Sequence, residues 1–167
     1  YAGHQLTEAG EEQAVKRRHA EVVAAAFATA DADHAQLGDE PWGAKYVAER
    51  HNVRAALGWA CTAGEPDVLA RLVAAMAQID SFAQTQHEVL QCEVPMDAIE
   101  RAAPGLRAAA CLEYSWAHYT DGNRVTGTQL ALRALEDYRG LGHEAGAYRA
   151  LAQLIRLYET RPGMQAE

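Results

Sequence analysis

The sequence predicts an all-α protein built from helical hairpins. Alanine is abundant, and only 7% of the 167 residues are aromatic. The β-branched residues are scattered and are not gathered into alternating runs, so helices are favoured over strands. Apolar residues make up 49% of the chain, which is ample for a hydrophobic core.

The first two helices are predicted over residues 11–37 and 42–63, where apolar residues recur with a period of about 3.6 positions. Gly38 to Pro41 separate them, and Pro41 suits the first turn of a helix, where its missing N–H costs nothing. Gly64 is expected to end the second helix. The predicted inward positions are Val15, His19, Val22, Val23, Ala26, Phe27 and Ala30, followed by Trp42, Tyr46, Val53, Leu57, Ala60 and Cys61. His19 is interpreted as a buried or half-buried packing residue.

A third helix is predicted over residues 66–82, packed antiparallel on the helix before it. In residues 83–103 the helical period weakens, because Pro95 interrupts it and glutamines dilute the apolar stripe. We expect short helices on either side of Pro95. The apolar stripe of the third helix consists of Leu69, Leu72, Val73, Met76 and Ile79.

Three more helices follow Pro104, and turns that contain glycine separate them. The first, over residues 105–120, is apolar on two faces and should lie between neighbouring helices. The second runs to about residue 139 and the third spans residues 144–159. Such helices with short turns favour a solenoid over a four-helix bundle. The predicted inward positions are Leu130, Ala131, Ala134, Leu135 and Tyr138, followed by Tyr148, Leu151, Ala152, Ile155 and Tyr158.

Charge and cysteine content restrict the class of function. The formal net charge is -8 and the pI is near 5.3, which disfavours direct binding to nucleic acid. The basic run at residues 16–18 lies among glutamates at helical spacing and is interpreted as self-paired surface charge. The three cysteines are odd in number and form no Cys-x-x-Cys pair, which indicates a reducing, cytoplasmic compartment.

No membrane span or signal peptide is predicted, since no apolar stretch reaches the roughly 18 residues that a span needs. The chain opens at Tyr1 and not at a methionine. We therefore expect a piece of a longer protein.

Three segments resemble one family. Residues 10–20 resemble the start of the helical region that follows the winged-helix part of bacterial signal-transduction ATPases, which include LuxR-type, SARP-type and adenylate-cyclase-linked transcriptional regulators. Trp42, residues 49–57 and Trp59 are similar to the family's "W…EhdNlRaALdW" signature. Residues 138–146 are similar to the junction between tetratricopeptide-like repeats.

The resemblance implies antiparallel helix hairpins stacked as a tetratricopeptide-like, right-handed superhelix. It divides the chain into the tail of a preceding winged-helix or linker region (1–9), first hairpins with an irregular stretch near 84–103 (10–103), and tetratricopeptide-like repeats (104–167). In the family a nucleotide-binding domain precedes this region. The Gly-x-x-x-x-Gly-Lys-Ser/Thr loop of such a domain does not occur in this sequence.

Two features depart from the family pattern. His143 stands where an acidic residue is usual, and Asp121-Gly122-Asn123 replaces the usual Gly-Asp order. The geometry of this turn is therefore left open.

Two groups of residues are candidate binding sites. Glu49, Asn52 and Trp59 share a helical stripe, and Arg54 flanks it. This group is either a docking surface for the preceding domain or a hydrogen-bond network that locks adjacent helices. The other group comprises aromatic and basic residues that could line the concave face of a superhelix or, for the aromatic ones, lie between helices. Its members are Trp116, Tyr119, Arg149 and Arg156, and the two arginines suit an anionic ligand.

No metal, cofactor or catalytic constellation is predicted. His87, Cys92, Cys111 and His118 lack the paired spacing of zinc ligands, and no Gly-x-Ser-x-Gly elbow occurs. The sequence thus predicts a non-catalytic module that binds a protein segment, peptide or small effector and couples it to the linked nucleotide-binding domain. A stand-alone scaffold or homodimer is the alternative, and a small all-α enzyme is a weaker one.

Overall fold

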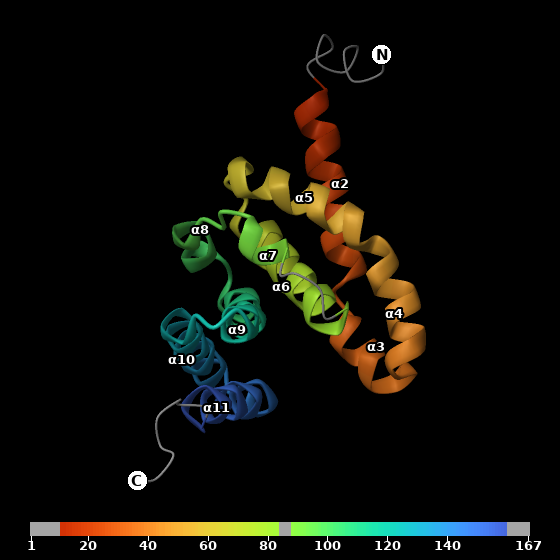
Figure 1. Ribbon diagram of the computed structural model, residues 1–167. Coiled ribbons are helices and arrows are strands. Elements are labelled where there is room, and N and C mark those ends of the chain that lie inside the picture. Colours follow the sequence, from red (N-terminus) through yellow and green to blue (C-terminus); the bar gives the residue numbers. More distant parts are fainter. Residues whose placement is uncertain (1–10, 84–87, 160–167) are drawn as a thin grey trace.

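The computed structural model describes residues 11–83 and 88–159, and every regular element in this part is a helix (Figure 1). The all-α prediction is confirmed. None of the described helices is both long and apolar enough to cross a bilayer. The helices are α2 (Glu12–Ala26), α3 (Ala30–Leu37), α4 (Asp39–Tyr46), the 3-10 helix η1 (Val47–Glu49), α5 (Arg50–Ala63), α6 (Pro66–Ala83), α7 (Glu88–Gln91), α8 (Met96–Arg101), α9 (Pro104–Thr120), α10 (Arg124–Gly140) and α11 (Glu144–Glu159).

The first predicted helix is in fact two helices, because the backbone turns between Ala26 and Ala30. Thr29 has φ -108° and ψ 5°, and Ala30 N–H donates to the Phe27 carbonyl three positions back, at 3.1 Å. The turn leads into α3 and α4, where Trp42 Nε1 donates to the Ala30 carbonyl at 2.8 Å. The indole of Trp42 therefore holds the first residue of α3 from the core side.

The inward face of α2 was predicted only in part. Val23, Phe27 and Ala30 are buried as expected, and Ala20 and Ala24 join them. Small alanines on this face allow α2 to pack closely against α5 and α6. The prediction was wrong for four positions, which are exposed: Val15, His19, Val22 and Ala26.

The second predicted helix is also divided, since η1 lies between α4 and α5. The predicted inward positions of this segment face the core: Trp42, Tyr46, Val53, Leu57 and Ala60 are buried, and Cys61 is half-buried. Gly64 ends α5 with φ 71°, the left-handed conformation expected of it.

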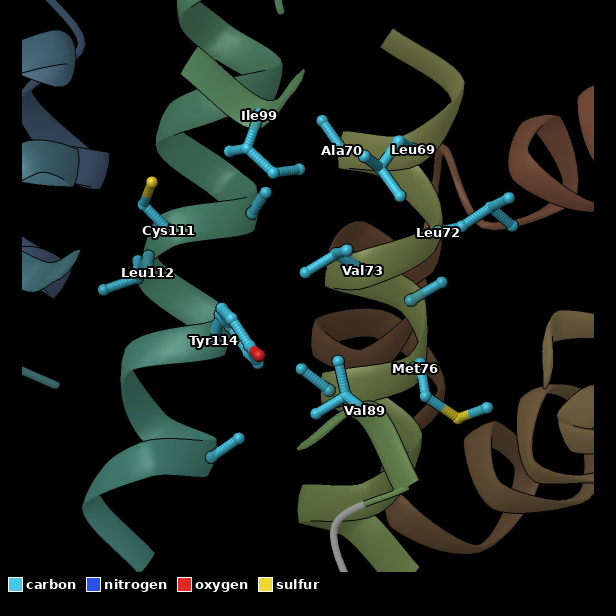
Figure 2. Close-up of a cluster of buried hydrophobic side chains, with 14 of the residues drawn as sticks. Leu69, Ala70, Leu72, Val73, Met76, Val89, Ile99, Cys111, Leu112 and Tyr114 are labelled. Carbon is cyan, nitrogen blue, oxygen red and sulfur yellow. The ribbon is translucent and has the colours of Figure 1, made fainter. Parts of the chain in front are cut away.

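Helix α6 is the central element of the fold and separates α2 to α5 from α8 to α11 (Figure 1). It packs against α2, α5, α8 and α9. Figure 2 shows Val73 of α6 and Tyr114 of α9 pointing toward each other. The side chains of Leu72 and Met76 project from the opposite side of α6. A helix with apolar residues on both sides is buried between two layers.

Short helices lie on either side of Pro95, as predicted. Asp80, which is fully buried on α6, accepts hydrogen bonds from Val89 N–H at 2.9 Å and from Arg50 Nη2 at 3.1 Å. This carboxylate ties α5 and α7 to the central helix. Burial raises the pKa of Asp80 despite these donors.

The two turns that join α9, α10 and α11 have the same geometry. Gly122 (φ 86°) and Gly142 (φ 65°) are both left-handed. The next residue in each turn donates its N–H to a carbonyl five positions back, Asn123 to His118 at 2.8 Å and His143 to Tyr138 at 2.9 Å. The chain therefore repeats one helix–turn unit after 20 positions, and this settles the turn geometry that the sequence left open.

Helix α9 lies between α6 and α10, as its two apolar faces predicted, and all the inward positions predicted for α10 are buried. For α11 the prediction was wrong. Its buried positions are Gly146, Ala150, Gln153, Leu154 and Leu157. Residues Tyr148, Leu151, Ile155 and Tyr158 form an exposed stripe, and Ala152 is half-buried.

The reason for this inversion is close packing at the start of α11. A Cβ atom on Gly146 would lie 2.5 Å from the Tyr138 ring. Gly146 and Ala150 therefore let the first turns of α11 approach α10 closely, and the large buried side chains of this face, Leu154 and Leu157, lie farther along the helix.

Candidate functional site

A groove of about 440 Å³ lies between α9, α11 and the end of α6. We call it the α9–α11 groove. Its lining includes Leu112, Glu113, Trp116, Arg149, Gln153 and Arg156. The structure thus brings together three residues that the sequence proposed for binding: Trp116, Arg149 and Arg156.

Helical spacing positions the side chains of the groove. Glu113 and Trp116 are three positions apart on α9, and Arg149 and Arg156 are two turns apart on α11, so each pair shares one helix face. Tyr119 continues the α9 face, and its ring centroid lies 5.3 Å from that of Trp116. Trp116 therefore gives the groove an aromatic surface, whereas Tyr119 packs against Trp116 and is not among the residues that line the groove.

Arg149 bridges two carboxylates from distant parts of the chain. Its Nη1 donates to Asp31 Oδ2 at 2.8 Å and its Nη2 donates to Glu113 Oε1 at 2.6 Å. Asp31 also accepts a hydrogen bond from Gln78 Nε2 at 2.8 Å. This contact, which we call the Arg149 bridge, connects α3 to α11 across 118 positions of sequence.

The two carboxylates of the bridge have different environments. The side chain of Asp31 is 62% exposed, whereas that of Glu113 is 14% exposed. Burial raises the pKa of Glu113 to about 7, and Arg149 opposes this shift. Glu113 therefore changes charge near neutral pH.

Residues of the Arg149 bridge also line two neighbouring cavities. A cavity of about 570 Å³ beside Tyr138 and His143 is lined by both Asp31 and Arg149. A third, of about 170 Å³ beside Trp42, is lined by Asp31, Arg149 and Glu113. Arg149 therefore lines the α9–α11 groove and both of these cavities.

Two further features of the groove bear on ligand binding. The guanidinium of Arg156 lies 5.4 Å from the centroid of the Trp116 ring, in a cation–π contact. Gln153 is only 4% exposed, and its Nε2 has no hydrogen-bond partner among the described residues. A buried amide without an acceptor is costly, and a ligand carbonyl or carboxylate could relieve that cost.

The structure places the other predicted site residues elsewhere. Asn52 Nδ2 donates to Glu49 Oε2 at 2.7 Å, and Trp59 Nε1 donates to Gln13 Oε1 on α2 at 3.1 Å. Arg54 is exposed on α5. None of these four candidates lines the α9–α11 groove. Trp59 connects α5 to α2, and Arg50 connects α5 to α6.

The cysteines show no sign of a reactive thiol. Burial raises the pKa of Cys61 to about 11 and that of Cys111 to about 12. Within residues 11–83 and 88–159, no three His, Cys, Asp or Glu side chains are grouped to hold a metal ion. His87, considered above as a ligand, lies outside the described residues.

Sequence reasoning missed Glu113 and Gln153, which line the groove, and Asp31, which accepts a hydrogen bond from Arg149 beside it. Glu113 and Gln153 occupy ordinary polar positions between apolar residues of their helices. Asp31 belongs to a segment read as one straight helix, and only the turn before Ala30 brings it to Arg149. No local pattern marks these residues.

Comparisons with protein-family models, curated proteins and solved structures gave no match.

Proposed function

We propose that this chain is a non-catalytic helical-repeat module of a bacterial signal-transduction ATPase that regulates transcription, and that it acts in the cytoplasm. The 20-position repeat of helix and turn from α9 to α11 supports stacking as a tetratricopeptide-like, right-handed superhelix. In this proposal the module binds a protein segment or effector and couples it to a linked nucleotide-binding domain.

The observation that carries the proposal is the Arg149 bridge beside the α9–α11 groove. A ligand in the groove would contact residues of α9 and α11, and Arg149 connects these helices to α3. Binding could therefore change how the first and last helices of the module sit relative to each other. A ligand shifts such an equilibrium only by its difference in affinity for the two arrangements.

The test uses the longer protein that contains this chain. Trp116→Ala and Arg156→Ala should reduce ligand-dependent switching of ATPase activity, because both side chains line the groove. Val125→Ala is the matched control, since Val125 is 72% exposed on α10. Unchanged switching in both groove variants would contradict the proposal.

A second candidate, a homodimer or protein scaffold, is favoured by the exposed stripe of α11. Tyr148, Leu151, Ile155 and Tyr158 are between 39% and 75% exposed on one helix face. Large apolar residues grouped on a surface mark interaction sites. Sedimentation of the wild type and of Ile155→Glu tests this candidate: a dimer that the charge dissociates supports it, and a wild-type monomer at high concentration argues against it.

A further inference from the structure

The α9–α11 groove already holds two guanidinium groups that belong to the chain itself. Arg149 lies between Asp31 and Glu113, at 2.8 and 2.6 Å. Arg156 lies over the Trp116 ring at 5.4 Å. Carboxylates and the face of an indole ring both bind guanidinium groups. The groove is therefore built to receive cationic side chains.

We propose that the groove binds an extended basic peptide segment, and that an arginine of this segment replaces Arg149 between Asp31 and Glu113. This inference rests on the proposed function and names the chemistry of the partner. In the unbound protein Arg149 then occupies the binding position between the two carboxylates, and the peptide arginine displaces it on binding.

The arrangement of three neighbouring pockets around Arg149 favours an extended peptide over a small molecule. The Arg149 bridge separates the groove from cavities of about 570 and 170 Å³. The groove of about 440 Å³ and both cavities have Arg149 in their lining, so a ligand that extends past this side chain contacts more than one of them. Displacing Arg149 would join these pockets into a channel that suits an extended chain.

Two independent observations indicate that the ligand has a peptide backbone and a positive charge. The unpartnered Nε2 of Gln153 can donate to a peptide carbonyl, the acceptor that an extended backbone offers at every residue. The chain has a formal net charge of -8, which attracts a basic segment over a distance. The Asp31 end of the bridge is exposed, and such pairs are weak enough to exchange partners.

The test measures binding of two labelled octapeptides, one of alternating Arg and Gly and one of alternating Glu and Gly, by fluorescence anisotropy at low salt. The basic peptide should bind the wild type. Arg149→Gln should tighten that binding about two- to fivefold, because the internal competitor is gone. Asp31→Asn and Glu113→Gln should weaken it by a similar factor.

Asp97→Asn is the matched control. It changes the net charge as Asp31→Asn does, but Asp97 pairs with Arg101 on the surface of α8. Thermal unfolding of each variant reports whether it is folded. If Arg149→Gln does not fold, Arg149→Lys keeps the charge and removes the forked donors that reach both carboxylates.

Fluorotryptophan NMR locates the bound peptide, since the chain has three tryptophans. The Trp116 signal should shift when the basic peptide binds. The Trp59 signal should not, because Trp59 bonds to Gln13 outside the groove.

Three results would overturn the inference. One is equal binding by Asp31→Asn and Asp97→Asn. Another is a shift of the Trp116 signal with the acidic peptide that disappears in Arg149→Gln. This result would mean that the groove binds a ligand, but an acidic one. The third is the absence of a Trp116 shift with either peptide. The proposed function would then be tested only by the switching experiment described above.

Discussion

Arg107 and Asp137 form a bidentate ion pair between α9 and α10. Arg107 Nε donates to Asp137 Oδ2 at 2.7 Å, and Arg107 Nη2 donates to Asp137 Oδ1 at 2.6 Å. Their side chains are 14% and 7% exposed. Arg107 Nη1 also donates to the Glu100 carbonyl at 2.8 Å, so the pair fixes the chain before α9 as well.

Removing one partner of this pair should destabilise the fold strongly. Arg107→Leu leaves the Asp137 carboxylate buried with only a long contact to Arg133, at 3.9 Å. The expected loss in the free energy of unfolding is about 3–5 kcal/mol, measured by urea denaturation. The double variant Arg107→Leu with Asp137→Leu should recover much of this loss, because no buried charge remains. A loss below about 1 kcal/mol in the single variant would contradict the argument.

Gly146 and Gly58 should respond oppositely to alanine. A Cβ on Gly146 would lie 2.5 Å from the Tyr138 ring and 2.7 Å from His143 Nδ1, so Gly146→Ala should cost about 1–3 kcal/mol. A Cβ added to Gly58, within α5, would meet no neighbouring atom within 4 Å. Gly58→Ala should therefore stabilise by about 0.5–1 kcal/mol. Melting temperatures of the two variants that move in the same direction would show that the packing argument is wrong.

The side chain of Asn123 caps α10. Its Oδ1 accepts a hydrogen bond from Thr126 N–H at 3.2 Å. Asn123→Ala should lower the free energy of unfolding by about 0.5–2 kcal/mol, the usual cost of losing such a cap. Gln129→Ala, at an exposed position of the same helix, is the control. A denaturant midpoint for Asn123→Ala that equals that of the control would exclude a stabilising cap.

Helix type and most helix ends could be predicted from the sequence, because periodicity and turn residues act locally. Gly64, Gly122 and Gly142 end their helices in the left-handed conformation, and such ends are readable in any sequence. The break after Ala26 could not be predicted, since it depends on Trp42 reaching the Ala30 carbonyl from another helix.

The face that a helix buries was harder to predict than the helix itself. On α11 the predicted inward residues Tyr148, Leu151, Ile155 and Tyr158 are exposed, because close approach to α10 at the start of the helix selects Gly146 and Ala150 for the buried face. The candidate site followed the same pattern. Trp116, Arg149 and Arg156 could be named from residue type, but Asp31 and Glu113 are brought to Arg149 only by the tertiary fold.

The stability of the protein should depend on pH through Glu113. Burial raises its pKa from the ordinary value of 4.5 to about 7 in the folded state. Between these two values the folded state binds more protons than the unfolded state, so the contribution of Glu113 to stability falls as the pH rises. This contribution is fully present below pH 4.5 and is lost by about pH 7.

Urea denaturation of the wild type and Glu113→Gln at several pH values tests this dependence. The difference between the two proteins should vary between pH 4.5 and 7, because glutamine does not titrate. Glu144→Gln, which removes an exposed carboxylate at the start of α11, is the control. A wild-type curve parallel to that of Glu113→Gln throughout this range would mean that Glu113 titrates alike in both states, and that the groove does not bury its charge.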